Sequence, residues 1–469
     1  MIQFPFVLDS RSGPLYQQLY EGLVEQLRTG GIPAGSRLPG KRALAQQLGV
    51  AVNTVDTAYQ MLVAEGYLES RPRSGFFALE VADTVSAAPQ APEPIPPLPE
   101  SPAWRFDLST GGVDTALFPF RTWGRIQKEL LYDAPELLSH GNRQGDRNLR
   151  EAVADYLALY RGVSCSPEQI VVGAGTEYLL SLAAGLLRGR TAAVEEPGYR
   201  RLRTILDNNG VLCRGVPIDE NGLDVDALRQ SGASLCCVTP SHHFPHAVTM
   251  PATRRAQLLR WANEARGRYI IEDDYDAEFR FDMRPLPSLQ GMAGQYGPVL
   301  YLCTFSKSLA PSIRIACMVL PPELLERYRE RYGSYSNTVS RFEQQTLCRF
   351  LTGGHFARHL SRMRGIYKTR MERLVRALKS ALPGISLRGT HTGLHLLLTL
   401  PNGPEERDMV ARARSAGIYL QGLSTYYAKD VWNAPPCPLH TVIIGYASLP
   451  DEDIQPLAET LRQVWLPAR

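Results

Sequence analysis

The chain has 469 residues, which is long enough for about two to four domains of ordinary size. Apolar residues make up 44% of it and charged residues 21%, so most of the chain can bury a core and a wholly disordered protein is excluded. The formal net charge of +4 excludes a histone-like polycation, but it leaves room for a small nucleic-acid-binding domain within a neutral protein.

No run of about 18 apolar residues occurs, and the first residues, MIQFPFVLDSRSG, lack the basic and apolar regions of a secretory signal. We therefore expect a cytoplasmic protein without membrane contact. The eight cysteines form no CxxC pair and have no histidine at ligand spacing. They are predicted to be reduced, mostly buried thiols, with no metal site and no disulfide framework.

The first eighty residues begin with a predicted amphipathic helix. Leucine recurs every four residues from Leu15 to Leu27, after Pro14 and before a glycine pair at 30–31. Residues 1–80 carry seven basic and seven acidic side chains, so this part of the chain has no overall basicity. Any contact with nucleic acid must depend on a few local charges.

Two further helices and a hairpin follow. The pattern predicts a helix over 41–48, a break at Gly49, and a helix that Asn53 caps and that runs through Leu62. After Gly66, YLESRPRSGFFA alternates apolar and polar residues on either side of a turn, which predicts a β-hairpin, or wing. Helix, turn, helix and wing together are typical of DNA-binding domains.

The stretch SRLPGKRALAQQLGVAVNTVDTAYQMLVAEGYLESRPRSGFF resembles the winged-helix domain of GntR-type transcription regulators. The resemblance implies contacts with double-stranded DNA from Arg37, Lys41, Arg42, Asn53, Thr54, Thr57, Arg71 and Arg73. Two features depart from the family: Ala51-Val52 replaces the usual Ser-Arg, and Arg73 replaces the usual wing glycine. The alternative is a module that contacts only other proteins.

Residues 81–103 read VADTVSAAPQAPEPIPPLPESPA, with recurrent proline and no lysine or arginine. Proline at this density favours extended polyproline II, a semi-rigid conformation of about 3 Å per residue. We expect a linker that separates a DNA-binding domain over 1–80 from a larger domain over 104–469.

Beyond the linker, short apolar runs alternate with helical patterns: QIVVG, TAAVEE, SLCCVTP, RYIIEDD and VLYLCTF. This alternation predicts an α/β domain with a mostly parallel sheet. Ligands of such sheets bind outside the carboxyl ends of the strands, so the polar residues at those ends belong together.

These residue types fit the chemistry of pyridoxal 5′-phosphate (PLP). The cofactor needs a lysine for a Schiff base, a carboxylate at its ring nitrogen and a hydroxyl near its ring oxygen O3′. Its phosphate needs N–H groups, hydroxyls and an arginine. The chain offers an acid, then a lysine, then an arginine seven residues further on: Asp273, Lys307 and Arg314.

That order, together with GNRQGDRNLREAVADYL, EEPGYR, TPSHHFPHAVTMP and TFSKSLAPSIR, resembles the fold-type I aminotransferase domain of the MocR/GabR-type subgroup of GntR regulators. By this resemblance Lys307 forms the Schiff base, Asp273 pairs with the pyridine nitrogen and Tyr275 bonds O3′. Tyr199 stacks on the ring, and Gly175, Thr176, Thr304, Ser306 and Arg314 hold the phosphate. A smaller α+β subdomain is expected over about 340–469.

The segment TPSHHFPHA departs from the family pattern. Phe244 replaces the asparagine that true aminotransferases carry beside O3′, and His243, His246 and Ala247 replace the subgroup's usual residues. His242 and His243 are therefore either walls of an effector pocket or structural residues, and Arg121 and Arg201 are further candidates for that pocket.

The predicted class of effector depends on an arginine that this sequence lacks. Many aminotransferases of this fold bind the substrate α-carboxylate through an arginine on a late strand, where HTVIIGYASLP has Ile443. We expect an amine with a remote or non-carboxylate anion, or PLP itself, as the effector. An alignment shifted by one residue would remove this argument.

The sequence thus predicts a PLP-dependent transcription regulator that senses an amine, an amino acid or a B6 vitamer, and the family resemblance implies a head-to-tail homodimer. One alternative is an active aminotransferase with a DNA-binding appendage. The other is a DNA-binding protein whose large domain has lost the cofactor and serves only for dimerisation.

Overall fold

We analysed a computed structural model, which describes residues 8–9, 11–80, 103–282, 286–428 and 436–466. The chain divides into two compact units, Met1–Ser101 and Pro102–Arg469. The predicted linker, except for its last residue, lies outside the described residues. In the described part of the chain, no helix is long and apolar enough to cross a membrane.

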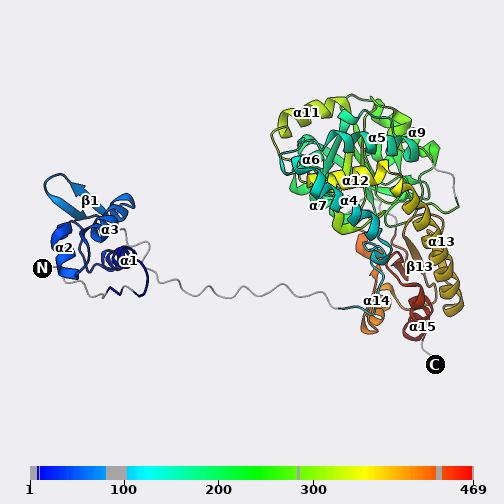
Figure 1. Ribbon diagram of the computed structural model, residues 1–469. Coiled ribbons are helices and arrows are strands. Elements are labelled where there is room, and N and C mark those ends of the chain that lie inside the picture. Colours follow the sequence, from blue (N-terminus) through cyan, green and yellow to red (C-terminus); the bar gives the residue numbers. More distant parts are fainter. Residues whose placement is uncertain (1–7, 10, 81–102, 283–285, 429–435, 467–469) are drawn as a thin grey trace. The chain divides into compact units, whose positions relative to one another are not determined.

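The first unit contains three helices and a hairpin (Figure 1). Its elements are α1 Leu15–Arg28, α2 Lys41–Leu48, α3 Val52–Ala64, β1 Leu68–Arg71 and β2 Gly75–Ala78. Leu19, Leu23 and Leu27 of α1 are buried against Tyr59 and Leu62 of α3, as their spacing predicts. The predicted bounds of the second helix are confirmed.

The predicted cap of α3 is wrong. This helix begins at Val52, with Ala51 in the extended conformation of an N-cap residue and no side-chain cap. Asn53 already lies in the first turn, where its carbonyl accepts a hydrogen bond from Thr57 Oγ1 (3.0 Å). An N-cap residue needs a non-helical backbone, so Asn53 cannot cap a helix that begins before it. Its side chain is exposed.

The hairpin confirms the predicted wing and explains one of its departures. Leu68 to Arg71 pair with Ala78 to Gly75 in antiparallel register. Arg73 in the turn has φ of 61°, the left-handed region in which glycine carries no penalty. The turn therefore needs this conformation, and the arginine adopts it at the cost of some strain.

The second unit is built on an eight-stranded sheet with the order β4-β11-β10-β9-β8-β5-β6-β7. The strands are β4 Ile170–Gly173, β5 Thr191–Glu196, β6 Leu212–Asp219, β7 Gly222–Leu223, β8 Leu235–Val238, β9 Tyr269–Asp274, β10 Val299–Thr304 and β11 Ala316–Val319. All five predicted strands are present and mutually parallel where they are neighbours. Strands β11 and β7 pair antiparallel to their neighbours.

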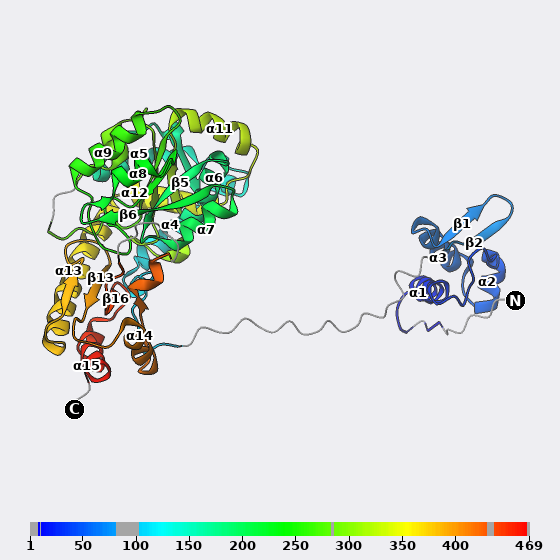
Figure 2. The same ribbon diagram turned by 180° about the vertical axis from the view of Figure 1, so that it is seen from behind.

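Helices cover both faces of this sheet (Figures 1 and 2). One face packs against α6 Thr176–Leu186, α7 Arg200–Asn208 and α11 Pro322–Tyr332. The other packs against α4 Phe120–Asp133, α5 Arg147–Arg161, α8 Val225–Gln230, α9 Ala252–Asn263, α10 Leu289–Ala293 and α12 Arg341–Thr352. Because both faces are covered, β4, β8, β10 and β11 are buried throughout and β5 and β9 nearly so, whereas β6 is partly exposed.

A smaller sheet with the order β12-β13-β16-β15 lies beside three helices at one end of this unit (Figure 2). Its strands are β12 Ser386–Arg388, β13 His395–Thr399, β15 Gln421–Gly422 and β16 Thr441–Gly445, and the helices are α13 His355–Ala381, α14 Glu406–Ser415 and α15 Ile454–Trp465. The short strand β3 Phe106–Asp107 pairs with β14 Ile418–Tyr419.

Single-turn 3₁₀ helices complete the described elements: η2 Thr115–Leu117, η3 Pro135–Leu138, η4 Pro167–Gln169, η5 Pro311–Ile313, η6 Leu423–Tyr426 and η7 Asp451–Asp453. The architecture is the predicted one: a winged helix, a large mostly parallel α/β domain and a smaller α+β domain. Helix α12, which falls within the predicted small subdomain, packs on α4 and α5 of the large one.

Candidate functional site

The carboxyl ends of the parallel strands open into a cavity of about 540 Å³. Eight of the nine predicted cofactor residues line it: Thr176, Tyr199, Asp273, Tyr275, Thr304, Ser306, Lys307 and Arg314. The ninth, Gly175, lies against Arg314, so close that a Cβ at this glycine would overlap the guanidinium. The structure therefore brings the whole predicted set together, as the strand-end rule requires.

Lys307 follows β10 and points its amine into this cavity. Its Nζ donates hydrogen bonds to the carbonyls of Thr110 and Gly111, the latter at 3.0 Å. Burial lowers the pKa of the Lys307 amine to about 8, although the nearby Asp276 carboxylate opposes this effect. About a tenth of the amine is thus uncharged at pH 7 and can act as a nucleophile.

Asp273 lies at the end of β9 with a buried oxygen, Oδ1, that has no hydrogen-bond partner in the described part of the chain. Burial, together with repulsion from Asp274 and Asp276, raises the pKa of Asp273 to about 7. A buried acceptor without a partner costs free energy. This carboxyl therefore fits a donor or a cation supplied by a ligand.

The turn between β4 and α6 forms the other end of the site. Gly175 has φ of +92°, and the turn places backbone N–H groups at the N-terminus of α6. Arg314 Nη2 donates to the Ala174 carbonyl (3.1 Å), and Thr304 Oγ1 donates to Ser306 Oγ (3.0 Å). Helix dipole, guanidinium and hydroxyls together favour an anion here.

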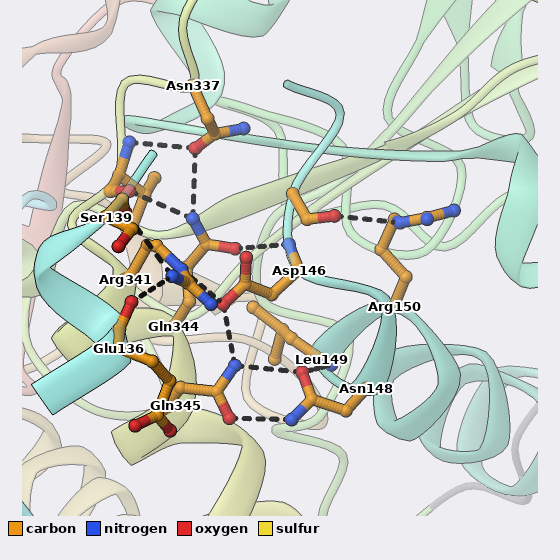
Figure 3. A network of polar contacts seen from close by, with 12 residues as sticks. Glu136, Ser139, Asp146, Asn148, Leu149, Arg150, Asn337, Arg341, Gln344 and Gln345 are labelled. Carbon is orange, nitrogen blue, oxygen red and sulfur yellow. Dashed lines mark hydrogen bonds and ion pairs between the residues drawn. The ribbon is translucent and has the colours of Figure 1, made fainter. Parts of the chain in front are cut away.

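A buried polar network supports this turn (Figure 3). Asp146 Oδ2, which precedes α5, accepts hydrogen bonds from Arg341 Nε and Gln345 Nε2 of α12. Gln344 Nε2 donates to Asn337 Oδ1, whose amide in turn donates to the Val172 carbonyl of β4 (2.8 Å). The predicted motif GNRQGDRNLREAVADYL thus acts as a structural support behind the glycine turn.

Two candidates for the effector pocket lie behind the cavity wall. His242 and His243 do not line the cavity among the described residues; His242 contacts Tyr275 and Asp276, and His243 Nε2 lies 3.7 Å from Glu195 Oε2. Burial lowers the pKa of His243 well below its ordinary value, so its imidazole is neutral.

The two arginine candidates differ. Arg201 lines the cavity and forms an ion pair with Glu177 (2.9 Å). Arg121 lies exposed near the start of α4 and lines neither of the two cavities found in the described part of this chain. This unit therefore offers Arg201 alone of the two for effector binding.

Three side chains could also hold a cation. His242, Asp276 and His395 place ligand atoms within 4.8 Å of one another. Lys307 lies near them, and its charge contributes to a pKa of His395 well below the ordinary value. A metal ion would have to share this space with the ammonium group, which disfavours it. The absence of a metal site stays a prediction.

A second cavity, of about 620 Å³, adjoins the first at Tyr199 and Asp273. Glu195, which lines it, accepts hydrogen bonds from Thr239 N and Oγ1 through Oε2, while Oε1 has no partner. Burial raises the pKa of Glu195 to about 8. Glu196 in the same wall pairs with Arg203.

Sequence reasoning missed several lining residues. Asp276 stands three residues after Asp273 in the same run of acids, so its position in the sequence could have revealed it. His395, Thr110 and Gly111 lack such a signal, because they come from β13 and from the loop after β3. Only the tertiary fold brings these segments to Lys307.

The predicted DNA-binding residues gather in the first unit. Arg37, Arg42, Asn53, Thr57, Arg71 and Arg73 are exposed, and Lys41 and Thr54 are half-buried. Lys41 forms an ion pair with Asp56 and lies over the Phe76 ring at 5.2 Å. Arg71 pairs with Glu69 at 2.8 Å. Arg42 is exposed at the start of α2, where a DNA phosphate can approach it.

Both units match known families. Residues 15–78 match bacterial regulatory proteins of the gntR family, and residues 106–461 match aminotransferase class I and II. Over 468 residues the chain is 38% identical to the uncharacterized HTH-type transcriptional regulator YhdI of Bacillus subtilis, covering 99% of this chain and 98% of that protein. The chain belongs to this family of regulators.

A second relative supports the subgroup. The regulator is 32% identical to the probable rhizopine catabolism regulatory protein MocR of Rhizobium meliloti, over 97% of this chain and 94% of that protein. Its fold is also similar to the solved kynurenine aminotransferase of Pyrococcus horikoshii, with a TM-score of 0.68 and 25% identity over 78% of this chain and 91% of that one. The regulator thus joins a helix-turn-helix domain to an aminotransferase fold.

Proposed function

We propose that this regulator binds PLP in the 540 Å³ cavity and that a small-molecule effector bound there controls its affinity for DNA. The observation that carries the proposal is the unpartnered, buried Oδ1 of Asp273 in the same cavity as the Lys307 amine. Few ligands satisfy a buried carboxyl, a nucleophilic lysine and an anion-binding turn at once.

The residues present fit this cofactor. Asp273, as a carboxylate, would accept a hydrogen bond from the protonated pyridine nitrogen, and Tyr199 would lie on the ring. The turn at Gly175, with Thr176 and Arg314, would bind the phosphate. When bound, PLP supplies a carbonyl that amines can attack and a ring that withdraws electrons.

The protein's own part is to control charge. Lys307 keeps an uncharged fraction because its pKa is lowered, and the carbonyls of Thr110 and Gly111 orient its amine. Asp273 gives up its proton when a cationic ring nitrogen lies beside it, since an opposite charge lowers a carboxyl pKa.

The effector we propose is an amine whose anion is remote from the amine or is not a carboxylate, or PLP itself. Ile443 is buried in β16, in an apolar cluster with Leu397 and Leu423, and so offers no charge to an α-carboxylate. In the sheet, Ile443 pairs with Gln421 of β15, and Gln421 lines the cavity. Arg201 and its neighbour Arg200 both line the described cavity wall and can bind a remote anion.

A second candidate function is transamination, favoured by the joint presence of Lys307, Asp273 and Tyr275 in one cavity. Multiple-turnover assays with panels of amino and keto acids distinguish the two. We expect binding without efficient turnover.

The test of the main proposal is an absorbance titration of the purified full-length protein. We expect a band from lysine-bound PLP that shifts on addition of particular amines, amino acids or B6 vitamers, and DNA affinity that changes at the same concentrations. A protein that neither retains PLP nor changes its DNA affinity would overturn the proposal and favour the dimerisation-only alternative.

A further inference from the structure

Two side chains behind Tyr275 form a hydrogen-bonded line that ends in the cavity. The Tyr275 hydroxyl lies 3.1 Å from His242 Nδ1, and the same nitrogen lies 2.8 Å from Asp276 Oδ2. His242 follows β8, whereas Tyr275 and Asp276 follow β9. The side chains of His242 and Asp276 are 0% and 2% exposed, so water does not compete for these contacts.

The position of one proton decides what Tyr275 can do. Nδ1 either carries a hydrogen or offers a lone pair, and an ionised carboxylate only accepts. With Asp276 ionised, Nδ1 must therefore carry the hydrogen and donate it. It then has no lone pair for the Tyr275 hydroxyl, whose own hydrogen must turn elsewhere.

The unpartnered Nε2 of His242 agrees with this arrangement. This nitrogen is buried and has no hydrogen-bond partner among the residues that the structure describes. A buried N–H without an acceptor is rarer and more costly than a buried acceptor without a donor. With the hydrogen on Nδ1, Nε2 carries only a lone pair. This tautomer is therefore the less costly of the two.

We propose that Asp276 and His242 are positioning residues that fix the Tyr275 hydroxyl as a hydrogen-bond donor toward the cavity. Asp276 holds the proton on His242 Nδ1, and the protonated nitrogen prevents Tyr275 from donating backward. Tyr275 then donates to the cofactor's ring oxygen, a step that rests on the proposed binding of PLP.

The imidazole ring is held in place from its other side. Gly393, in the loop before β13, lies so close to His242 that a Cβ there would overlap the ring. Its N–H donates to the Phe279 carbonyl (2.7 Å), and its own carbonyl accepts a hydrogen bond from the Tyr446 hydroxyl. The small subdomain thus contacts His242, the residue that orients Tyr275.

Several charged and titratable groups surround Tyr275 and His242. They are Asp273, Asp274 and Asp276 from the end of β9, Glu195 from β5, His243 from the same loop as His242, His395 from β13, and Lys307 from the end of β10. Burial and the nearby carboxylates raise the pKa of Tyr275 well above its ordinary value. Its hydroxyl therefore keeps its proton and remains a donor.

Replacement of Asp276 has two effects of opposite sign, which makes the proposal testable. The Asp276 charge raises the pKa of Lys307, so its removal alone would lower the pH at which lysine-bound PLP loses its proton. Loss of the Tyr275 donor would instead raise that pH, because the donor stabilises the ring oxyanion left after deprotonation.

The experiment is a pH titration of the absorbance of the full-length protein with PLP bound. In Asp276→Leu, which removes the acceptor that holds the hydrogen on His242 Nδ1, we expect the midpoint to rise by about one pH unit, because a hydrogen bond to a charged group is lost. In the Tyr275→Phe background, the same substitution should leave the midpoint unchanged or lower it. His242→Asn keeps an N–H donor near the position of Nδ1 and should stay within about 0.3 pH unit of the unmodified protein.

The matched control is Asp282→Asn, which removes an exposed carboxylate paired with Lys368 and should not move the midpoint. A midpoint that falls or stays constant in Asp276→Leu would overturn the proposal. A rise that persists in the Tyr275→Phe background would do the same, since it could not come from the hydroxyl.

A second measurement does not require the cofactor. Nitrogen NMR of labelled histidine in the cofactor-free protein should place the His242 proton on Nδ1, and in Asp276→Leu, which offers no acceptor, the form with the proton on Nε2 should gain population. A proton on Nε2 in the unmodified protein would overturn the proposal. If the unmodified protein shows no PLP band, the proposed function fails while this measurement still decides the proton position.

Discussion

At the scale of single residues, burial brings the pKa values of Lys307 and Asp273 close together. The amine is lowered to about 8 and the carboxyl is raised to about 7, so both change charge near neutral pH. Each group is unfavourable in its ordinary charge state until a ligand supplies the opposite charge. A cavity with this property selects a ligand that carries both a reactive carbonyl and a protonatable ring.

The clearest residue-scale prediction concerns Lys307. Lys307→Ala should abolish the absorbance band of lysine-bound PLP and the adduct trapped by borohydride, because no other lysine lines this cavity in the described part of the chain. The variant should remain folded by circular dichroism. A variant that keeps both signals would show that another lysine binds the cofactor.

The pH dependence of stability gives a second prediction. Glu195 has a folded-state pKa of about 8 against an ordinary value of 4.5, so between these values the folded state binds more protons than the unfolded one. Stability of the cofactor-free protein should therefore fall as pH rises through this window. Glu195→Gln should flatten that decline in thermal unfolding followed between pH 5 and pH 8. An unchanged slope would count against the buried, protonated Glu195.

At the scale of elements, loops between strands carry the site, and their conformations depend on particular glycines. Gly175 allows Arg314 to approach the turn before α6, and Gly393 allows the small subdomain to approach His242. Both have positive φ, of +92° and +74°. A side chain at either position meets strain and overlap together.

Gly393→Ala therefore has a matched control. Gly384 has a similar φ of +82° but has no atom within 4 Å of where a Cβ would lie. Both substitutions should lose about 1 kcal/mol or more of stability from backbone strain. Gly393→Ala alone should also weaken PLP binding several-fold, measured by cofactor fluorescence. Equal PLP affinity in the two variants would contradict the contact with His242.

The helix-turn-helix makes a prediction at the same scale. Arg42 is exposed at the start of α2, so Arg42→Ala should weaken binding to specific and non-specific DNA alike and reduce the salt slope by about one. Asn53→Ala should blur sequence preference, and because Asn53 does not cap α3, it should leave helix stability nearly unchanged. Gel-shift titrations at several salt concentrations measure both effects, and unaltered titrations would mean that another surface binds DNA.

At the scale of the whole molecule, the second unit exposes apolar surface away from its cavity. Phe120, Leu131 and Tyr132 of α4 and Leu138 of η3 are 63% to 81% exposed. Exposed apolar side chains that cluster on one element commonly mark a protein interface. They support the proposed homodimer, in which two DNA-binding units would recognise two half-sites.

We expect the combined substitution Leu131→Glu and Leu138→Glu to convert the dimer into monomers in sedimentation experiments, since charge at a buried interface is costly. Leu212→Glu, at a 58% exposed leucine that begins β6, is the control and should leave the dimer intact. A dimer that survives the double substitution would place the interface elsewhere.

The sequence by itself determined the elements and their chemistry, because periodicity and strand-end position are local properties. It predicted α1, α2, the wing, the five strands β4, β5, β8, β9 and β10, and eight residues that line the cavity. It misplaced the start of α3, since Ala51 gives no capping signal and Asn53 gives a misleading one. The contacts of Lys307 with Thr110 and of His242 with Gly393 join segments far apart in the chain. Only the tertiary structure decides such contacts, because burial and the direction of each side chain depend on how the two subdomains pack.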